Sequence, residues 1–199
     1  MLRIVPYSHP ALRYESVPVQ RIDATLRSQV RAMFDLMYEA KGIGLAANQV
    51  ALPFRFFILN LTADPDQPQN EQVFINPEIV KRHSSLIEEE GCLSFPKLYH
   101  EVQRARKIRV RAFDLEGNLI EIEAEDLLSR AIQHETDHLN GRLFIDHLAA
   151  GDLRNLSPKI KEIEAGYRKD QAEGIYPSDA EIRRQLNELA GRGTGTKVV

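Results

Sequence analysis

The residues with the clearest chemical potential are two histidines spaced four apart, with a glutamate after the first. His134, Glu135 and His138 lie in the segment QHETDHL. On an α-helix both imidazoles would project from one face about one turn apart, so they could bind a single metal ion. The glutamate could reach a water on that metal and act as its general base. The alternative is a helix with two ordinary histidines, since short motifs also occur by chance.

A catalytic metal site of this type needs a third protein ligand and one open position. Downstream, HETDHLNGRLF has Phe144 where the metzincin pattern requires its last histidine, and His147 comes three residues later. Upstream, Cys92 is the single cysteine and lies in EGCLSFP between Gly91 and Pro96. Its thiolate would complete a set of two histidines and one cysteine. Taken alone, an unpaired cysteine is more often a small buried apolar residue.

A third segment, GIGLAANQV over residues 42–50, combines two glycines and two alanines with the amide of Gln49. Small side chains allow an extended substrate to approach the backbone closely. Such loops also follow helices simply because they permit tight packing. The segment therefore gains functional weight only in combination with the other two.

Hydrophobic spacing predicts the elements that position these segments. Apolar residues three and four apart predict a helix over residues 21–40, with Asp23 as N-cap and Gly42 in the left-handed position at its end. Aromatic and β-branched runs predict strands over residues 54–59 and 72–80. These elements flank the small-residue segment.

The metal-binding motif itself is expected on a helix that follows a β-hairpin. Residues 107–125 alternate apolar and polar side chains around Gly117-Asn118, which is typical of a hairpin. Residues 125–141 then show a helical apolar rhythm that stops at Gly141. From Ala150 onward the chain is rich in charged residues, and we expect one or two surface helices there.

Composition excludes several classes of protein. The 199 residues are 43% hydrophobic, which is enough for one domain with a core, and the net charge of −3 argues against direct nucleic-acid readout. The apolar runs are far shorter than the ~20 residues of a membrane span. Pro6 and Pro10 interrupt the start of the chain, so we expect no secretory signal there and an intracellular location.

The segments GIGLAANQV, EGCLSFP and QHETDHL, in this order, resemble the three signature segments of the peptide deformylases. The resemblance covers residues 2–148, including the opening RIVPYSHPALR. It implies an α+β fold in which antiparallel β-sheets surround the central HExxH helix, with an N-terminal amphipathic helix and a C-terminal helical tail. We therefore expect a catalytic domain over residues 1–150 and a helical extension over 151–199, whose GRGTGTKVV end is expected to be disordered.

The resemblance also implies the activity and the residues that perform it. The enzyme would hydrolyse the formyl group from the N-terminal formylmethionine of newly synthesised polypeptides and release formate. The implied metal ligands are Cys92, His134 and His138; the implied catalytic groups are Glu135, the Gln49 amide and the Leu93 backbone N–H; and the implied substrate contacts are Ile43, Gly44, Glu90, Gly91 and Ala131. The cofactor would be one divalent ion, Fe²⁺ in most of the family, although the same ligands also suit Zn²⁺ or Ni²⁺.

The remaining expectations concern partners and competing functions. The resemblance implies bacterial cytoplasm as the location and, as in bacterial relatives, a position near the ribosomal tunnel exit; we expect no membrane contact. One alternative is a structural metal module that takes a fourth ligand from His83, His100 or His147. Another is a zinc aminopeptidase in which the cysteine is inert.

Overall fold

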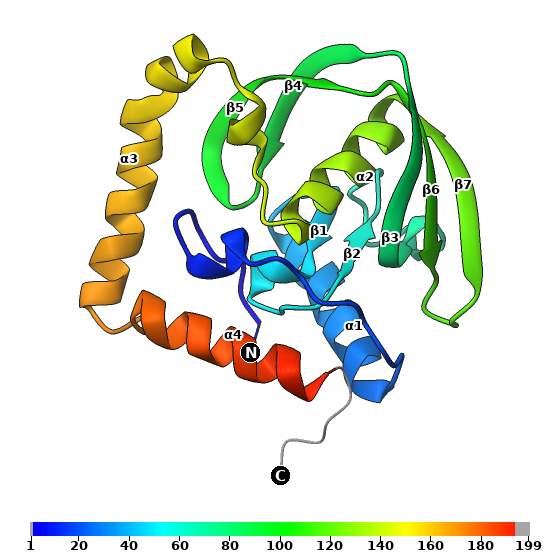
Figure 1. Ribbon diagram of the computed structural model, residues 1–199, viewed down its shortest axis with the longest axis horizontal. Helices are drawn as coiled ribbons and strands as arrows, with labels where there is room; N and C mark the ends of the chain where they lie inside the picture. The colour runs from blue at the N-terminus through cyan, green and yellow to red at the C-terminus, as the bar shows by residue number, and fades with distance from the viewer. Residues whose placement is uncertain (1, 194–199) are drawn as a thin grey trace.

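The structure is a computed structural model and describes residues 2–193 (Figure 1). The helices are α1 (Ala24–Glu39), α2 (Asp126–Leu139), α3 (Ala150–Ala172) and α4 (Asp179–Arg192). The strands are β1 (Gly44–Ala46), β2 (Phe56–Leu59), β3 (Gln72–His83), β4 (Leu86–Cys92), β5 (Phe95–Arg104), β6 (Lys107–Phe113) and β7 (Leu119–Glu125).

A five-stranded antiparallel sheet with the order β1-β2-β3-β6-β7 forms the framework, and helices pack on both of its faces. Strand β2 shows how the sequence achieves this. Phe56 and Ile58 belong to the core cluster that includes α1, whereas Phe57 and Leu59 belong to the cluster that includes α2. Alternate residues of a strand face opposite sides, so a fully apolar strand fits a sheet that is covered on both.

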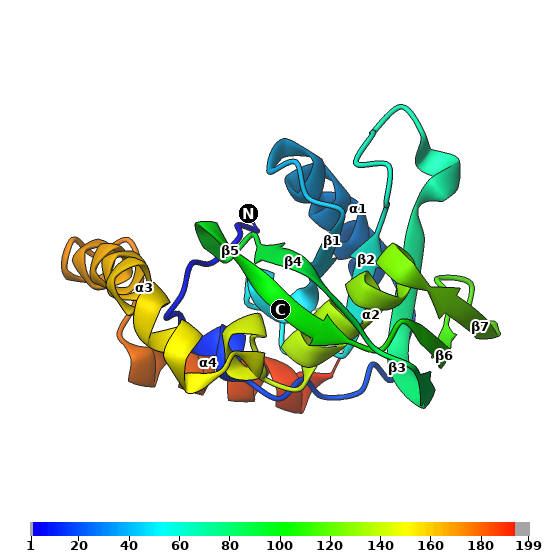
Figure 2. The same cartoon turned by 90° about the horizontal axis from the view of Figure 1, so that it is seen from above.

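Helix α2 occupies the centre of the molecule because a second sheet covers its remaining side (Figures 1 and 2). This sheet is the antiparallel pair β4-β5. Arg130 of α2 binds Glu90 of β4, and Gln133 binds the backbone of Ala105 just after β5. The α+β fold with antiparallel sheets is therefore confirmed, and these contacts explain why a helix rich in polar residues is almost entirely buried.

The predicted N-cap of the first helix is present, but its predicted glycine stop is wrong. The Asp23 side chain accepts a hydrogen bond from the Leu26 N–H at 2.9 Å. At the other end, Lys41 rather than Gly42 adopts the left-handed conformation, with φ of 55°. The Gly42 N–H then donates to Met37 O at 2.8 Å, which is the bond of a Schellman motif. Gly42 instead lies close to Leu93, since a Cβ there would stand 2.7 Å from the Cδ1 of that movable side chain.

The β4-β5 hairpin was not predicted from the sequence. Strand β4 reads LIEEEGC, and its one buried residue is a charged one, Glu90. Glu88 and Glu90 both reach Arg130. An apolar-alternation rule cannot recognise a strand whose buried face is satisfied by ion pairs.

The chain after residue 150 folds as two helices that return to the body of the protein. Tyr167 of α3 is buried in the cluster that includes Phe95 and Phe144. Ile182 and Leu186 of α4 pack on Ala11 near the N-terminus. Of the segment expected to be disordered, Gly191 and Arg192 complete α4, and residues 194–199 lie outside the described part. No helix within residues 2–193 is both long and apolar enough to span a bilayer.

Candidate metal centre

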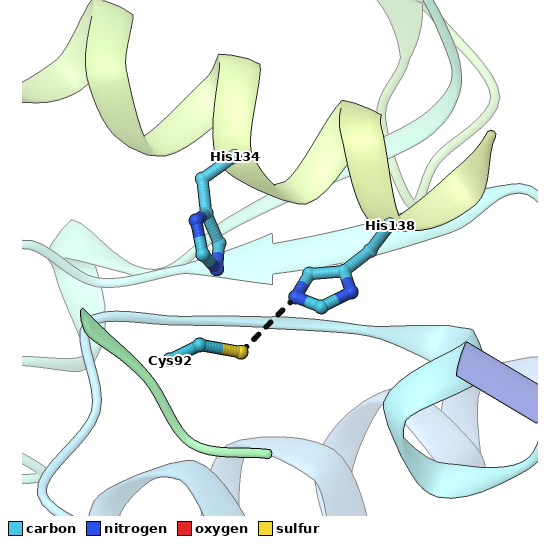
Figure 3. A group of neighbouring side chains, drawn as sticks. All are labelled: Cys92, His134 and His138. Atoms are coloured by element: carbon cyan, nitrogen blue, oxygen red, sulfur yellow. Dashed lines mark hydrogen bonds between the residues drawn. The ribbon is translucent and has the colours of Figure 1, made fainter. Parts of the chain in front are cut away.

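Three side chains from two distant segments of the chain converge on one face of α2 (Figure 3). Cys92 ends β4, and His134 and His138 project toward it from successive turns of α2. Their ligand atoms all lie within 4.8 Å of one another. The Cys92 Sγ is 3.3 Å from the His138 Nε2. The structure thus brings together the three residues that the sequence singled out as metal ligands.

The spacing of these atoms suits one tetrahedral metal ion. With metal–sulfur and metal–nitrogen bonds of about 2.3 and 2.1 Å, a tetrahedral angle places the two ligand atoms about 3.6 Å apart. The observed separation of 3.3 Å between Cys92 Sγ and His138 Nε2 is close to this value. No fourth histidine, cysteine or acidic residue of the described chain joins the group. The donor set therefore fits a site with an open position and gives no support to a closed structural module.

The carboxylate of Glu90 fixes the orientation of His134 through the ring nitrogen that is not available to a metal. Its Oε1 lies 2.5 Å from the His134 Nδ1, which leaves the Nε2 of His134 for a metal. Arg104 donates to both Glu90 oxygens at 3.1 and 2.8 Å, and Arg130 donates at 3.1 Å. Burial opposes ionisation of Glu90, but the hydrogen bonds from His134 and Arg104 hold its pKa well below the usual range. Glu90 thus remains an anion that fixes the imidazole.

The family resemblance placed Glu90 at the edge of a substrate pocket, and it suggested for Arg104 either a contact with the substrate backbone or a solvated position. Arg104 is 5% exposed and also binds Asp137, which receives a second contact from His147 at 2.7 Å. This buried network joins β4, β5 and α2 around the ligands. The sequence carried no clear signal for this network, because Glu90 is satisfied as a buried group only once Arg104 and Arg130 are brought beside it.

Glu135 is positioned by the glycine of β1. The Glu135 side chain is buried, and burial raises its pKa to about 7. One carboxylate oxygen, Oε2, has no hydrogen-bond partner within the described chain. The other, Oε1, lies only 2.5 Å from the point where a Cβ on Gly44 would stand. The absence of a side chain at Gly44 therefore allows the carboxylate to sit beside the metal ligands.

We expect Gly44→Ala to lower deformylation through this contact. The added methyl would also meet Leu59 Cδ2 at 2.7 Å, so Glu135 must turn away. The predicted result is a kcat reduced by about 10- to 100-fold with bound metal retained, because a shift of about 1 Å in a reacting group can cost that much. Gly166→Ala is the control, since nothing lies within 4 Å of a Cβ there. Equal kcat values for both variants would contradict the positioning of Glu135 by Gly44.

The side-chain amide of Gln49 lies next to Cys92. Gln49 belongs to the 3-10 helix η2 (Ala47–Val50), and its Oε1 accepts from the Ala46 N–H at 2.8 Å. This bond turns the Nε2 toward Cys92 Sγ at 3.5 Å and Ser94 Oγ at 3.3 Å. The amide donor therefore faces the metal ligands, in the direction where a developing negative charge would need it.

A pocket of about 470 Å³ opens next to these groups. Its wall contains Gln49, Leu93, Glu135 and the metal-ligand candidates Cys92 and His134. The five residues expected to contact substrate also line it, namely Ile43, Gly44, Glu90, Gly91 and Ala131. Tyr99 covers Gly91 so closely that a Cβ on that glycine would lie 2.5 Å from the ring. Apart from His138, all residues that the resemblance assigned as metal ligands, catalytic groups or substrate contacts thus line one cavity.

Comparison with known proteins places the chain in one family. The model of the polypeptide deformylase family matches residues 1–153. A peptide deformylase of Rhodopirellula baltica is 41% identical over 194 residues, which are 98% of this chain and 96% of the relative. One of Chromobacterium violaceum is 42% identical over 82% of this chain and 96% of its own length.

Solved structures give the same result. A Plasmodium falciparum peptide deformylase superposes with a TM-score of 0.81 at 40% identity and covers 84% of this chain and 98% of its own. A Legionella pneumophila peptide deformylase superposes with a TM-score of 0.76 at 35% identity, over 89% of this chain and 100% of its own. The chain therefore belongs to the peptide deformylases, the metal-dependent hydrolases that remove the N-formyl group from N-terminal formylmethionine.

Proposed function

We propose that Cys92, His134 and His138 hold the catalytic metal ion of this deformylase and that Glu135 moves the proton during hydrolysis. The observation that carries the proposal is the convergence of the three ligand atoms within 4.8 Å, beside the buried Glu135 carboxylate. When bound, the divalent ion supplies a lowered pKa for a coordinated water and polarisation of the formyl carbonyl.

The protein's own groups then account for the remaining steps. Glu135 accepts a proton from the attacking water as the new C–O bond forms, and it delivers that proton to the amine nitrogen as the C–N bond breaks. The products are formate and a free amino terminus. One carboxylate can serve both steps because the water and the amine meet at the same carbon.

Charge on the former carbonyl oxygen requires hydrogen-bond donors in place before the reaction. We assign this role to the Gln49 Nε2, which faces the ligands, and to the backbone N–H of Leu93, which follows Cys92 directly. Loss of one such donor in comparable sites costs about 3 kcal/mol of transition-state stabilisation. The bond from Ala46 to the Gln49 Oε1 supports this role, because it fixes which end of the amide points inward.

The substrate's methionine side chain is assigned to the pocket. Ile43 and Ala131 provide apolar lining that suits a flexible thioether, and Gly44 and Gly91 leave backbone accessible to the peptide. The carboxylate of Glu90 is already committed to His134, so we assign its contribution to the wall of the pocket rather than to direct contact.

We further propose residues 1–150 as the catalytic domain and 151–199 as an extension, since every assigned residue precedes residue 150. The substrates are new polypeptides and the relatives named above include bacterial enzymes. These points support action in the bacterial cytoplasm near the ribosomal tunnel exit. The outward surfaces of α3 and α4 are available for such a contact, while their buried residues anchor them to the body.

We assign Fe²⁺ as the physiological ion on the basis of family membership, because two histidines and a thiolate bind zinc equally well. Protein purified without oxygen is expected to contain about one iron per chain. Exposure to air should abolish most of its activity as the iron or the Cys92 thiolate is oxidised. Elemental analysis with activity measured before and after exposure tests this. An anaerobic preparation that contains zinc and is indifferent to air would contradict the assignment.

A further inference from the structure

The 3-10 helix η2 connects the two chain segments that carry the metal-ligand candidates. Asn48 is completely buried, and its Nδ2 donates a hydrogen bond to the backbone carbonyl of His138. The next residue, Gln49, reaches the other way, to Cys92 and Ser94. Adjacent residues of one short turn thus contact the helix that bears both histidines and the end of strand β4 that bears the cysteine.

Two polar atoms near this contact are buried without a hydrogen-bond partner in the described chain. One is the Nδ1 of His138 and the other is the Oδ1 of Asn48. The His138 Nε2 faces Cys92 Sγ at 3.3 Å, so it is the nitrogen available to a metal and Nδ1 must carry the ring proton. The Asn48 amide cannot be reversed, because its Nδ2 already donates to a carbonyl. A buried donor and a buried acceptor therefore lie on two residues in direct contact.

We propose that Asn48 is the positioning residue of His138: its Nδ2 holds the end of α2, and its Oδ1 accepts the His138 Nδ1–H through one buried water. Buried polar groups left unpaired are costly, and a water with two or more polar partners removes that cost. Metal-binding histidines commonly donate their second nitrogen to such an acceptor, which fixes the tautomer and the ring orientation. His134 already has this support from Glu90, whereas His138 has no direct equivalent.

The test measures zinc affinity by competition with a chelator, together with the melting temperature of the metal-free protein. Asn48→Leu keeps the branched shape of the side chain but removes both polar atoms. We expect zinc to bind about 10- to 100-fold more weakly, as for loss of other partners that orient a ligand. The metal-free melting temperature should fall no further than in the control variant described next, because both substitutions remove side-chain hydrogen bonds of a buried asparagine. Zinc affinity equal to that of the wild type would overturn the proposal.

Asn60→Leu is the matched control, because Asn60 is also completely buried but lies outside the group of ligands. Its side chain bonds to Tyr38 and Thr62. This variant should also lower the melting temperature but leave zinc affinity unchanged, so the zinc affinity alone distinguishes it from Asn48→Leu. If both variants weakened zinc binding equally, a general effect of disturbed packing would replace the positioning role.

A second variant keeps the test decisive if Asn48→Leu does not fold. Asn48→Asp retains an acceptor for the Nδ1–H but loses the donor to the His138 carbonyl, so it should retain more zinc affinity than Asn48→Ala. Equal affinities of these two variants would overturn the role of Oδ1.

The inference rests on His138 being a ligand, and His138→Ala separates the proposed metal site from the proposed role of Asn48. Wild-type zinc affinity in His138→Ala would refute the proposed metal site itself, whereas loss there with no loss in the Asn48 variants would refute only this inference.

Discussion

Replacing Glu135 with glutamine should lower kcat for formyl-peptide hydrolysis by about 10²- to 10⁴-fold, the usual contribution of a general acid–base group. Glutamine has almost the same shape, so the close fit against Gly44 is preserved. It cannot take a proton from water at neutral pH. Because the adjacent ligands are untouched, the metal content should stay at one ion per chain.

The measurement is a formate-release assay paired with elemental analysis of the same sample. Glu188→Gln is the control, because Glu188 is an exposed residue of α4 that binds Arg184 far from the pocket. This control should retain full turnover. Wild-type turnover in Glu135→Gln would refute its role as the base, and loss of the metal would mean that Glu135 supports the site rather than the chemistry.

Replacing Cys92 with serine should remove both metal and activity. A serine hydroxyl stays protonated at neutral pH and is a poor ligand, whereas a thiolate binds transition metals strongly. We expect metal affinity to fall by more than about 100-fold, because even the loss of groups that only orient a ligand costs 10- to 100-fold. Deformylase activity should fall in proportion to occupancy.

His83→Asn serves as the control for this substitution, because His83 ends β3 on the exposed surface and does not belong to the ligand group. It should keep one metal per chain. Full activity in Cys92→Ser would mean that the cysteine is inert, which is the result that a zinc aminopeptidase using only the HExxH helix would give.

Much of the site could be predicted from the sequence because its chemistry depends on short local spacing. His134 and His138 are four residues apart on α2, and helical geometry alone places their side chains on one face. The pairing with Cys92 could be predicted only because the helix lacked a third ligand nearby. That argument uses coordination number rather than packing, so it needs no knowledge of the fold.

The parts that escaped prediction depend on contacts between distant segments. The sequence does not reveal that Glu90 supports His134, because Arg104 and Arg130, which hold Glu90 in place, lie 14 and 40 residues later. The hairpin that contains Glu90 was missed for the same reason. Lys41 takes the left-handed position expected of Gly42, and Gly42 lies against the side chain of Leu93. In each case tertiary contacts override a correct local preference.

The central claim is that one metal ion, held by a thiolate and two imidazoles, enables this chain to deformylate peptides. Its most direct test is to add Fe²⁺ without oxygen to metal-free protein and to measure formate released from formyl-Met-Ala-Ser at each step. Our account predicts that activity rises linearly and reaches its plateau at one ion per chain. A chain that binds one ion with full occupancy and releases no formate would contradict it.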